Sequence, residues 1–305
     1  MEKYDIIIIG AGPAGLTAGL YGGRQGNKVL LLEAKLAGGV GREVPAMENY
    51  PGFDIIAGVS LADKMKSQCE KNAQINELEK VNNIKKLENE EYNFEISTNN
   101  QSYLSKTIIL ATGSSHKHLN IKGEKEFVGR GVSYCATCDG MFFREKDVVM
   151  VGGGNSALQE AIYLSNIGCN VTIIHRRDKF RGEEFLQKRA KEKGIKTIMN
   201  SNVISINGET LVESVTIKDN KNNIKELKTN AIFISIGYDP HIELANKLNV
   251  NINENNYIIT DKNQRTNVKY IYSAGDVTGG LNQWVVACSE GAIAATSAYE
   301  DIENQ

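Results

Sequence analysis

The sequence predicts an α/β fold built from two similar units, the second inserted into the first. Three observations lead to this prediction. A strand, a glycine-rich turn, a helix and another strand follow one another in residues 4–33, and the same order returns from Asp147 onward. Each copy is also followed by a later strand that runs into glycine. The chain has 305 residues, which is enough for two hydrophobic cores.

The first copy opens with an apolar run at residues 4–9 that ends in glycine, as a buried parallel strand does. Residues 13–24 then have the pattern of a helix, and residues 28–32 that of a second strand, which ends at Glu33. This order is typical of one βαβ unit.

The rest of the first unit is expected to contain an antiparallel meander and a further strand. Apolar and polar residues alternate over residues 77–103. Residues 107–110 form an apolar run that leads into the loop Ala111, Thr112 and Gly113.

The second copy repeats this plan. Its expected elements are, in order, a strand at 148–151, a glycine-rich turn at 152–157, a helix at 157–167, a strand at 171–174, an alternating region at 201–230 and a strand at 231–236. Residues 270–276 resemble the strands that end in glycine but have no later partner, and residues 283–299 predict a last helix. The simplest division assigns residues 1–114 and 241–305 to the first domain and residues 115–240 to the second.

The overall composition excludes several classes of protein. A net charge of −2 with 41% hydrophobic residues gives no indication of a nucleic-acid or membrane-surface partner. The early apolar run at 6–9 is far shorter than the ~20 residues of a membrane helix and lacks the flanks of a signal peptide. Five cysteines without regular spacing do not form a disulfide scaffold. We therefore expect a cytoplasmic protein.

The first glycine turn predicts a dinucleotide site. Residues 10–15 fit the pattern G-x-G-x-x-G, in which the glycines permit a tight turn, backbone approach to a pyrophosphate and close packing of helix on strand. Glu33 stands where a carboxylate accepts hydrogen bonds from a ribose. A turn without a ligand is the alternative, and the complete strand–turn–helix–strand–acid order disfavours it. Asp276, just past a strand, either grips the same ligand or caps the helical region.

The second glycine turn predicts a site for a phosphorylated dinucleotide. Gly152, Gly154 and Ala157 open the second helix, but no acid follows the next strand. His175, Arg176, Arg177 and Arg181 stand there instead. Guanidinium groups suit a 2′-phosphate, which favours NADPH over NADH. A basic, solvated helix surface is the alternative.

Cys135 and Cys138 form the chemical centre of the sequence. Two intervening residues allow both a disulfide and a dithiol. A structural zinc would need four ligands, and the close histidines His116 and His118 do not have a common zinc spacing, so no metal is expected. Asp139 follows directly and could exchange protons with the thiols, or simply cap a turn. The isolated Cys69, Cys169 and Cys288 are interpreted as core residues.

These motifs together resemble the low-molecular-weight thioredoxin reductases, nearly from end to end. The resemblance rests on residues 10–15, 48–52, 111–113, 131–140, 152–157, 175–181 and 274–276. It implies two Rossmann-like, three-layer ββα domains, FAD in the first and NADPH in the second, a homodimer, and thioredoxin or a related redoxin as partner. It further implies that Cys138 exchanges electrons with the flavin, Cys135 attacks the partner disulfide and Asp139 shuttles the proton.

The resemblance also assigns cofactor positions. Those expected at FAD are Gly10, Gly12, Pro13, Ala14, Gly15, Glu33, Gly38, Gly39, Asn49, Ala111, Thr112, Gly113, Gly275, Asp276, Asn282, Gln283 and Trp284. Those expected at NADPH are Gly154, Asn155, Ser156, His175, Arg176, Arg177 and Arg181. Three positions depart from the family pattern: Val40 replaces Gln, Asn155 replaces Asp, and Asn282-Gln283-Trp284 replaces Arg-Gln-Ala, which places a large ring near the expected isoalloxazine.

Since the disulfide and the nicotinamide both belong to the second domain and both must meet one flavin, we expect that domain to swing about linkers near residues 114–118 and 238–242. Other functions remain open. A reductase fed by ferredoxin or a deazaflavin, or a thiol oxidase, would tend to lack the arginine cluster. An alkyl hydroperoxide reductase subunit would need an extra N-terminal module, whereas this sequence begins at the first strand. A flavin-binding redox sensor would not need fast nicotinamide turnover.

Overall fold

The computed structural model describes residues 1–44, 47, 49–88 and 91–304. Of the sequence predictions, the one on Glu48 lies outside these residues. The chain divides into two compact units. The first consists of Met1–Ser115 with Asp239–Gln305, and the second of His116–Tyr238. The second unit therefore interrupts the first, and the predicted α/β fold of two similar units is confirmed.

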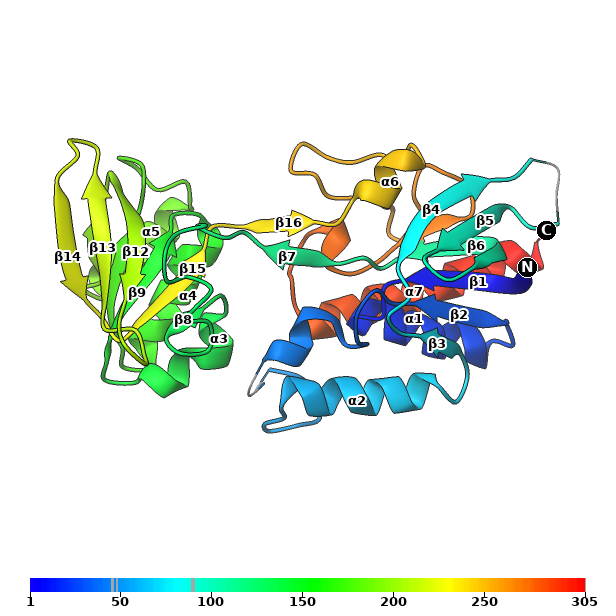
Figure 1. Cartoon of the computed structure of the whole chain (residues 1–305), viewed down its shortest axis with the longest axis horizontal. Helices are drawn as coiled ribbons and strands as arrows, with labels where there is room; N and C mark the ends of the chain where they lie inside the picture. Colours follow the sequence, from blue (N-terminus) through cyan, green and yellow to red (C-terminus); the bar gives the residue numbers. More distant parts are fainter. Residues whose placement is uncertain (45–46, 48, 89–90, 305) are drawn as a thin grey trace. The chain divides into compact units, whose positions relative to one another are not determined.

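The first unit is built on one mixed sheet (Figure 1). Its strands are β1 (Glu2–Ile9), β2 (Val29–Leu32), β3 (Gln74–Asn76), β4 (Val81–Lys86), β5 (Phe94–Thr98), β6 (Ser102–Leu110) and β17 (Ile271–Ser273). They follow the order β3-β2-β1-β6-β5-β4, and β17 also pairs with β6. β1, β2, β3, β6 and β17 pair in parallel, while β4, β5 and β6 pair antiparallel. The predicted meander is thus continuous with the parallel sheet, because β6 belongs to both.

Helices cover the sheet of the first unit. They are α1 (Pro13–Arg24), α2 (Gly58–Cys69), α6 (Glu243–Lys247) and α7 (Trp284–Glu303), with short 3-10 turns at Gly39–Glu43 and Asp276–Thr278. α1 and α7 approach each other closely: a Cβ at Gly291 would lie 2.1 Å from the carbonyl oxygen of Ala14. Apolar side chains that alternate along β1 enter two separate cores, with Ile6 and Ile8 on one face and Ile7 and Ile9 on the other.

The second unit holds a parallel sheet and a smaller antiparallel one. The parallel sheet has the order β11-β10-β9-β15-β8 and contains β8 (Val132–Ser133), β9 (Asp147–Gly152), β10 (Asn170–Ile174), β11 (Lys196–Ile198) and β15 (Ala231–Ser235). The antiparallel sheet contains β12 (Ser201–Asn207), β13 (Ser214–Asp219) and β14 (Ile224–Lys228). The helices are α3 (Ala136–Asp139), α4 (Asn155–Asn166) and α5 (Glu184–Glu192), and a 3-10 turn spans Gly140–Phe143.

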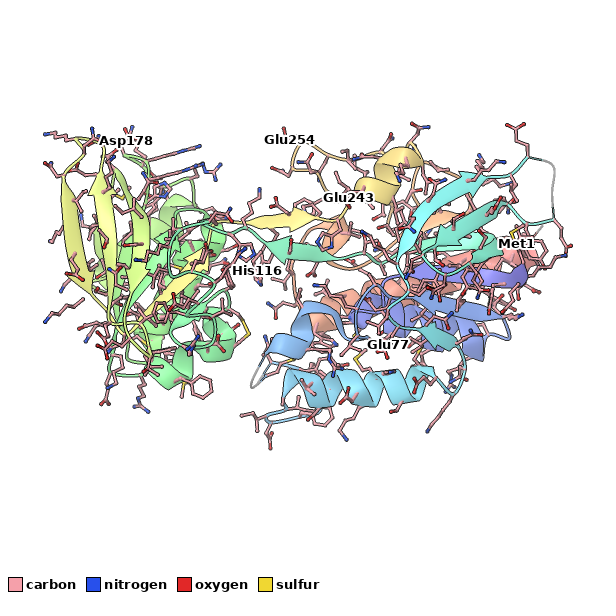
Figure 2. The ribbon with its side chains drawn as sticks, viewed as in Figure 1. Met1, Glu77, His116, Asp178, Glu243 and Glu254 are labelled. Carbon is pink, nitrogen blue, oxygen red and sulfur yellow. A yellow bond between two sulfur atoms is a disulfide. The ribbon has the colours of Figure 1, made fainter. Side chains whose placement is uncertain are left out.

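Two short strands connect the units. β7 (Ser114–His116) and β16 (Tyr238–Pro240) form a two-stranded sheet of their own. His116, labelled in Figure 2, lies between two aromatic rings, 5.2 Å from the ring centre of Tyr134 and 4.8 Å from that of Tyr238. Among the helices described, none combines the length and apolar character that crossing a bilayer requires.

Candidate active site and nucleotide sites

The two cysteines of the redox turn (residues 133–139) form a disulfide. Cys135 stands at the N-terminal end of α3, and its carbonyl oxygen accepts the N–H groups of Cys138 at 3.3 Å and Asp139 at 3.1 Å. This single helical turn brings the two Cα atoms to 5.3 Å, within the range that a disulfide spans. In the described residues no three side chains of His, Cys, Asp or Glu gather as metal ligands. The pair is therefore placed for thiol–disulfide chemistry.

Asp139 faces back toward the start of the redox turn. The hydroxyl of Ser133 donates a 2.5 Å hydrogen bond to Oδ2 of Asp139 and accepts the N–H of Cys135 at 3.1 Å. Oδ1 of Asp139 is enclosed and has no hydrogen-bond partner in the described part of the chain. Burial raises the pKa of this carboxyl group, although the Ser133 hydroxyl opposes the shift. A carboxyl group whose pKa is raised can hold a proton beside its sequence neighbour Cys138.

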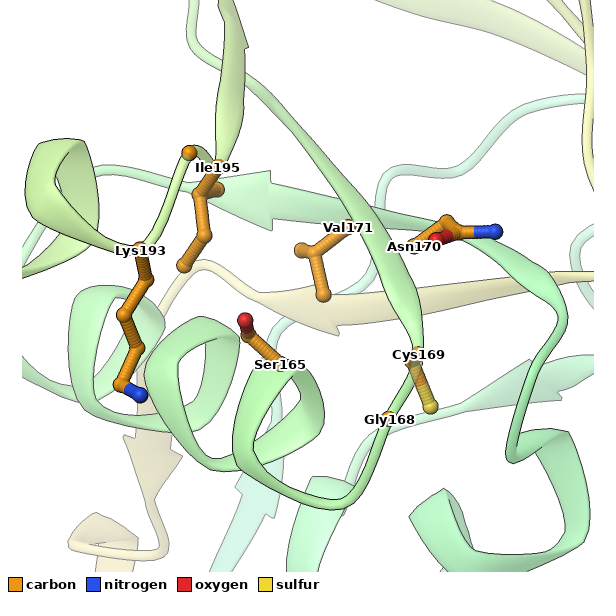
Figure 3. A pocket seen from close by; sticks show the side chains of 8 residues that line it. Ser165, Gly168, Cys169, Asn170, Val171, Lys193 and Ile195 are labelled. Carbon is orange, nitrogen blue, oxygen red and sulfur yellow. The ribbon is translucent and has the colours of Figure 1, made fainter.

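The remaining three cysteines are free. Cys69 and Cys169 are buried, as expected, and burial raises the pKa of Cys69 to about 12. Cys169 donates to the carbonyl oxygen of Phe143 at 3.1 Å and lies beside a shallow hollow of about 290 Å³ (Figure 3). The prediction is wrong for Cys288, which is only half-buried because it lies at the margin of a small apolar cluster beside Tyr50.

The first glycine turn has the geometry that its sequence predicts. Gly10 has φ of +101°, and a Cβ on Gly15 would lie 1.9 Å from the carbonyl oxygen of Gly10, so α1 packs directly on β1. A Cβ on Gly12 would meet nothing nearer than the Cα of Gly39 at 4.0 Å. This space at the N-terminus of α1 fits a dinucleotide's pyrophosphate. Glu33 lies at the end of β2, and its carboxylate accepts the N–H of Ala11 at 2.8 Å.

Hydrogen bonds link several other positions expected at FAD to this turn or to one another. The N–H of Gly38 donates to the carbonyl oxygen of Ala11 at 2.7 Å, which places the loop 38–39 against the turn. The amide of Asn49 donates to Oε1 of Gln283 at 2.8 Å. The N–H of Ala111 bonds to Ile9 at the end of β1. The structure therefore brings the loop 38–39 and the end of β6 to the first glycine turn, and it joins Asn49 to Gln283.

The turn that contains Gly275 and Asp276 is held by a residue that the sequence did not indicate. Glu290 on α7 accepts the N–H of Gly275 at 2.7 Å and the hydroxyl of Thr278 at 3.1 Å. Burial raises the pKa values of both Asp276 and Glu290. The sequence could have indicated Glu290, because this acid shares a face of α7 with Ala287, Gly291 and Ala294, which are buried.

Trp284 belongs to a small apolar core. Its ring packs with Met47, Ile56 and Leu61, and its Nε1 donates to the sulfur of Met65 at 3.1 Å. The ring also covers Gly41, where a Cβ would lie 2.2 Å away. Trp284 thus joins α7 to α2 and the Gly39–Glu43 turn, and its expected position near a flavin ring stays a prediction.

The second glycine turn resembles the first. Gly152 ends β9, and Gly154 is the N-cap of α4, where an added Cβ would meet nothing within 4 Å. Open space at this helix N-terminus again fits a pyrophosphate. Asn155 exchanges two hydrogen bonds with Glu183, its amide donating at 2.9 Å and its oxygen accepting the Glu183 N–H at 2.8 Å. The side chain that departs from the family pattern therefore ties the loop after β10 to the turn.

The arginine cluster is exposed, but His175 is not. Arg176, Arg177 and Arg181 are exposed, and none of them forms an ion pair with a described residue. The N–H of Arg181 donates to the carbonyl oxygen of Gly153 at 2.8 Å, so these cations lie beside the turn. His175 is buried under Gly153, and burial lowers its pKa. Its neutral ring supports the turn, whereas the free guanidinium groups fit a 2′-phosphate.

Comparisons with known proteins give a consistent result. The family model described as pyridine nucleotide-disulphide oxidoreductase matches residues 4–291. A Clostridium pasteurianum protein described as a 34.2 kDa protein in rubredoxin operon is 40% identical, covering 99% of this chain and 98% of its own length. The thioredoxin reductase of Treponema pallidum is 41% identical over 98% of this chain and 97% of its own. The crystal structure of thioredoxin reductase from Streptococcus pyogenes is 38% identical, covers 99% of both chains and has a TM-score of 0.85.

Proposed function

The chain belongs to the pyridine nucleotide-disulphide oxidoreductases, and we propose that within this family it reduces the disulfide of thioredoxin or a related redoxin. It is a flavoprotein that uses FAD and NADPH. The observation that carries the proposal is the Cys135–Cys138 disulfide with Asp139 at its side, in the same unit as a glycine turn flanked by free arginines.

Cys135, Cys138 and Asp139 each have a separate role in the reaction. When bound, FAD accepts a hydride from NADPH and supplies the two electrons that open the disulfide. Cys138 exchanges electrons with the cofactor side, and Cys135 attacks the disulfide of the partner protein. Asp139, with its raised pKa and enclosed oxygen, holds the proton that the leaving thiolate needs.

The cofactor positions follow from the two turns. In the first unit, the open space at Gly12, the loop 38–39, the Asn49–Gln283 pair and the turn at 275–276 support the assignment of FAD. In the second unit, Gly154, Asn155 and the three exposed arginines support NADPH. In this proposal His175 contributes to NADPH binding by supporting the glycine turn on which its ring packs.

Turnover requires the second unit to change its orientation. One flavin must receive electrons from a nicotinamide and give them to a disulfide, and both of these belong to the second unit. The strands β7 and β16 are the only described connections between the units, so rotation takes place about these two segments. A cross-link that fixes one orientation is expected to stop turnover, and full activity of the cross-linked protein would contradict rotation.

The assembly and location are part of the same proposal. We place the protein in the cytoplasm, since three free cysteines and a cycling dithiol suit a reducing compartment. We further propose a homodimer, as in the family that the sequence resembles. Sedimentation of the FAD-loaded protein at micromolar concentration tests the oligomeric state, and a monomer would contradict it.

Stopped-flow reduction tests the function directly. NADPH is expected to bleach the flavin rapidly and NADH slowly, and oxidised thioredoxin should then restore the oxidised spectrum. Cys135→Ser should keep the NADPH-dependent bleaching and lose reduction of thioredoxin. If NADPH leaves the flavin oxidised while reduced ferredoxin or a reduced deazaflavin bleaches it, the electron donor differs from the proposed one. If no donor sustains turnover, the result supports the redox-sensor hypothesis instead.

A further inference from the structure

A second enclosed carboxyl group lies behind the redox turn. Glu160 is on α4, and its Oε1 accepts a hydrogen bond of 3.2 Å from the hydroxyl of Ser235 at the end of β15. The backbone N–H of Ala136, the residue after Cys135, lies near enough to this carboxyl group to lower its pKa. Oε2 is enclosed and has no hydrogen-bond partner among the residues that the structure describes. Glu160 therefore connects the helix after the second glycine turn to the redox turn.

The environment of Glu160 favours its neutral form. Burial raises the pKa of this carboxyl group to about 7, although the donors Ser235 and Ala136 lower it. The carboxyl group thus stands near the midpoint of its titration at neutral pH. A small change in nearby charge is enough to decide whether it carries a proton.

The elements packed on α4 bring few charges to this point. β15 and β10 contain no titratable side chain, and β9 contains only Asp147, at its opposite end. α5 carries five charged residues, all exposed: Glu184, Lys188, Arg189, Lys191 and Glu192. α3 and its N-cap carry Cys135, Cys138 and Asp139. The charge that changes during turnover therefore arises on the redox turn itself.

We propose that Glu160 is a positioning residue for the redox turn and that it takes up a proton when the Cys135–Cys138 disulfide is reduced. When a dithiol is the reductant, it is oxidised to its own disulfide and gives up two electrons and two protons. The S–S bond between the cysteines breaks, one sulfur becomes a thiol and the other stays a thiolate. The second proton goes to the Glu160 carboxylate. The thiolate charge replaces the carboxylate charge, so the net charge is unchanged.

An ionised Glu160 lies against Ala136, the residue after Cys135, so its charge and a thiolate on the redox turn oppose each other. A neighbouring negative charge raises the pKa of a carboxyl group by about one to two units at short range in a buried site. From a value near 7 in the disulfide form, the pKa of Glu160 is expected to rise by that amount in the reduced form. At a pH of about 7.5 the group then changes from mostly ionised to mostly protonated. Proton uptake by Glu160 removes the opposing charge and makes the thiolate easier to form.

Infrared difference spectroscopy of the FAD-loaded protein tests the proposal. The reduced-minus-oxidised spectrum, with dithiothreitol as reductant at a pH of about 7.5, should show the carbonyl band of a newly protonated carboxylic acid. Glu160→Gln keeps an oxygen that accepts from Ser235 but cannot titrate, so it should lose this band. The matched control Glu209→Gln removes an exposed carboxylate of the same unit and should keep it. Asp139→Asn should also keep the Glu160 contribution.

A second variant tests the proposal even if the Glu160→Gln protein does not fold. Ser235→Ala removes a donor to the ionised carboxylate, so the pH at which the Glu160 band reaches half its intensity should rise. A band of equal size in Glu160→Gln and the unaltered protein would overturn the proposal, as would an unchanged or lower midpoint in Ser235→Ala.

The inference rests on the proposed function only in requiring that the cysteine pair cycles. A count of free thiols separates the two. If dithiothreitol does not raise the count by two, the pair does not cycle and the proposed function fails. If the count rises by two without a signal from Glu160, only the present inference fails.

Discussion

Ser133 sets the proton affinity of Asp139, and its removal should change the pH dependence of catalysis. Its hydroxyl bridges the Asp139 carboxyl, at 2.5 Å, and the N–H of Cys135, at 3.1 Å. Ser133→Ala removes both contacts, together with the hydroxyl's 3.3 Å contact to the carbonyl oxygen of Cys135, and adds no bulk. Because a hydroxyl donor stabilises the ionised carboxylate, its loss favours the protonated form. The pKa of Asp139, already raised by burial, should therefore rise further.

The size of this shift can be worked from the contact. A hydrogen bond to a charged group contributes about 1.5–3 kcal/mol, and solvent screening reduces this at the half-buried Asp139. One pKa unit corresponds to about 1.36 kcal/mol, so the remaining effect is about one unit upward. If protonated Asp139 supplies the proton to a leaving thiolate, the alkaline limb of the activity profile should move up by the same amount.

The assay is a titration of the Asp139 carboxyl carbon by NMR in the FAD-loaded protein, together with the pH profile of thioredoxin reduction. Ser214→Ala is a matched control, since Ser214 donates a hydrogen bond of the same 2.5 Å length to Glu226 in the same unit. The control should leave the pKa of Asp139 unchanged. An Asp139 pKa that falls, or that stays within a few tenths of its original value in Ser133→Ala, would refute this assignment.

Two further variants test other parts of the structure. Arg181→Ala should raise KM for NADPH about tenfold to a hundredfold, because a charged hydrogen bond to phosphate contributes about 1.5–3 kcal/mol. Steady-state kinetics with NADPH and NADH measure this change. An equal rise in KM for NADH would contradict the 2′-phosphate assignment. Trp284→Ala removes the ring from the core between α2 and α7 and should lower the free energy of unfolding by about 3–5 kcal/mol in urea titrations. Val285 is exposed, so Val285→Ala should lower it by less than about 1 kcal/mol. Similar losses for both variants would show that the Trp284 ring does not stabilise this core.

The sequence predicts best those features whose physical cause is local. The glycine turns need positive φ, close backbone packing or open space at fixed offsets, so Gly10, Gly15 and Gly154 are recognisable from spacing alone. The disulfide of Cys135 and Cys138 is closed by one helical turn, which two intervening residues allow. Strand and helix positions also follow from apolar periodicity, with differences of a few residues at their ends.

Features that depend on distant contacts cannot be predicted in the same way. His175 precedes two arginines, and the sequence alone groups it with them, but packing under Gly153 turns its ring inward. Ser133, Glu160 and Glu290 escape prediction, because each acts through a partner on another element. Glu160 does leave a signal, since an acid stands on the helix face shared by the buried Ala157, Ala161 and Leu164.

The paired connecting strands have a consequence for how such a chain could arise. The N–H of Lys117 donates to the carbonyl oxygen of Gly237 at 3.0 Å, so the beginning and end of the second unit are neighbours. A domain whose ends meet can be placed in a loop of another protein with little disturbance of either host or guest. The second unit is thus a domain that can be inserted into another protein. Closing its ends by a short link and opening it elsewhere should give a permuted module that folds without its host.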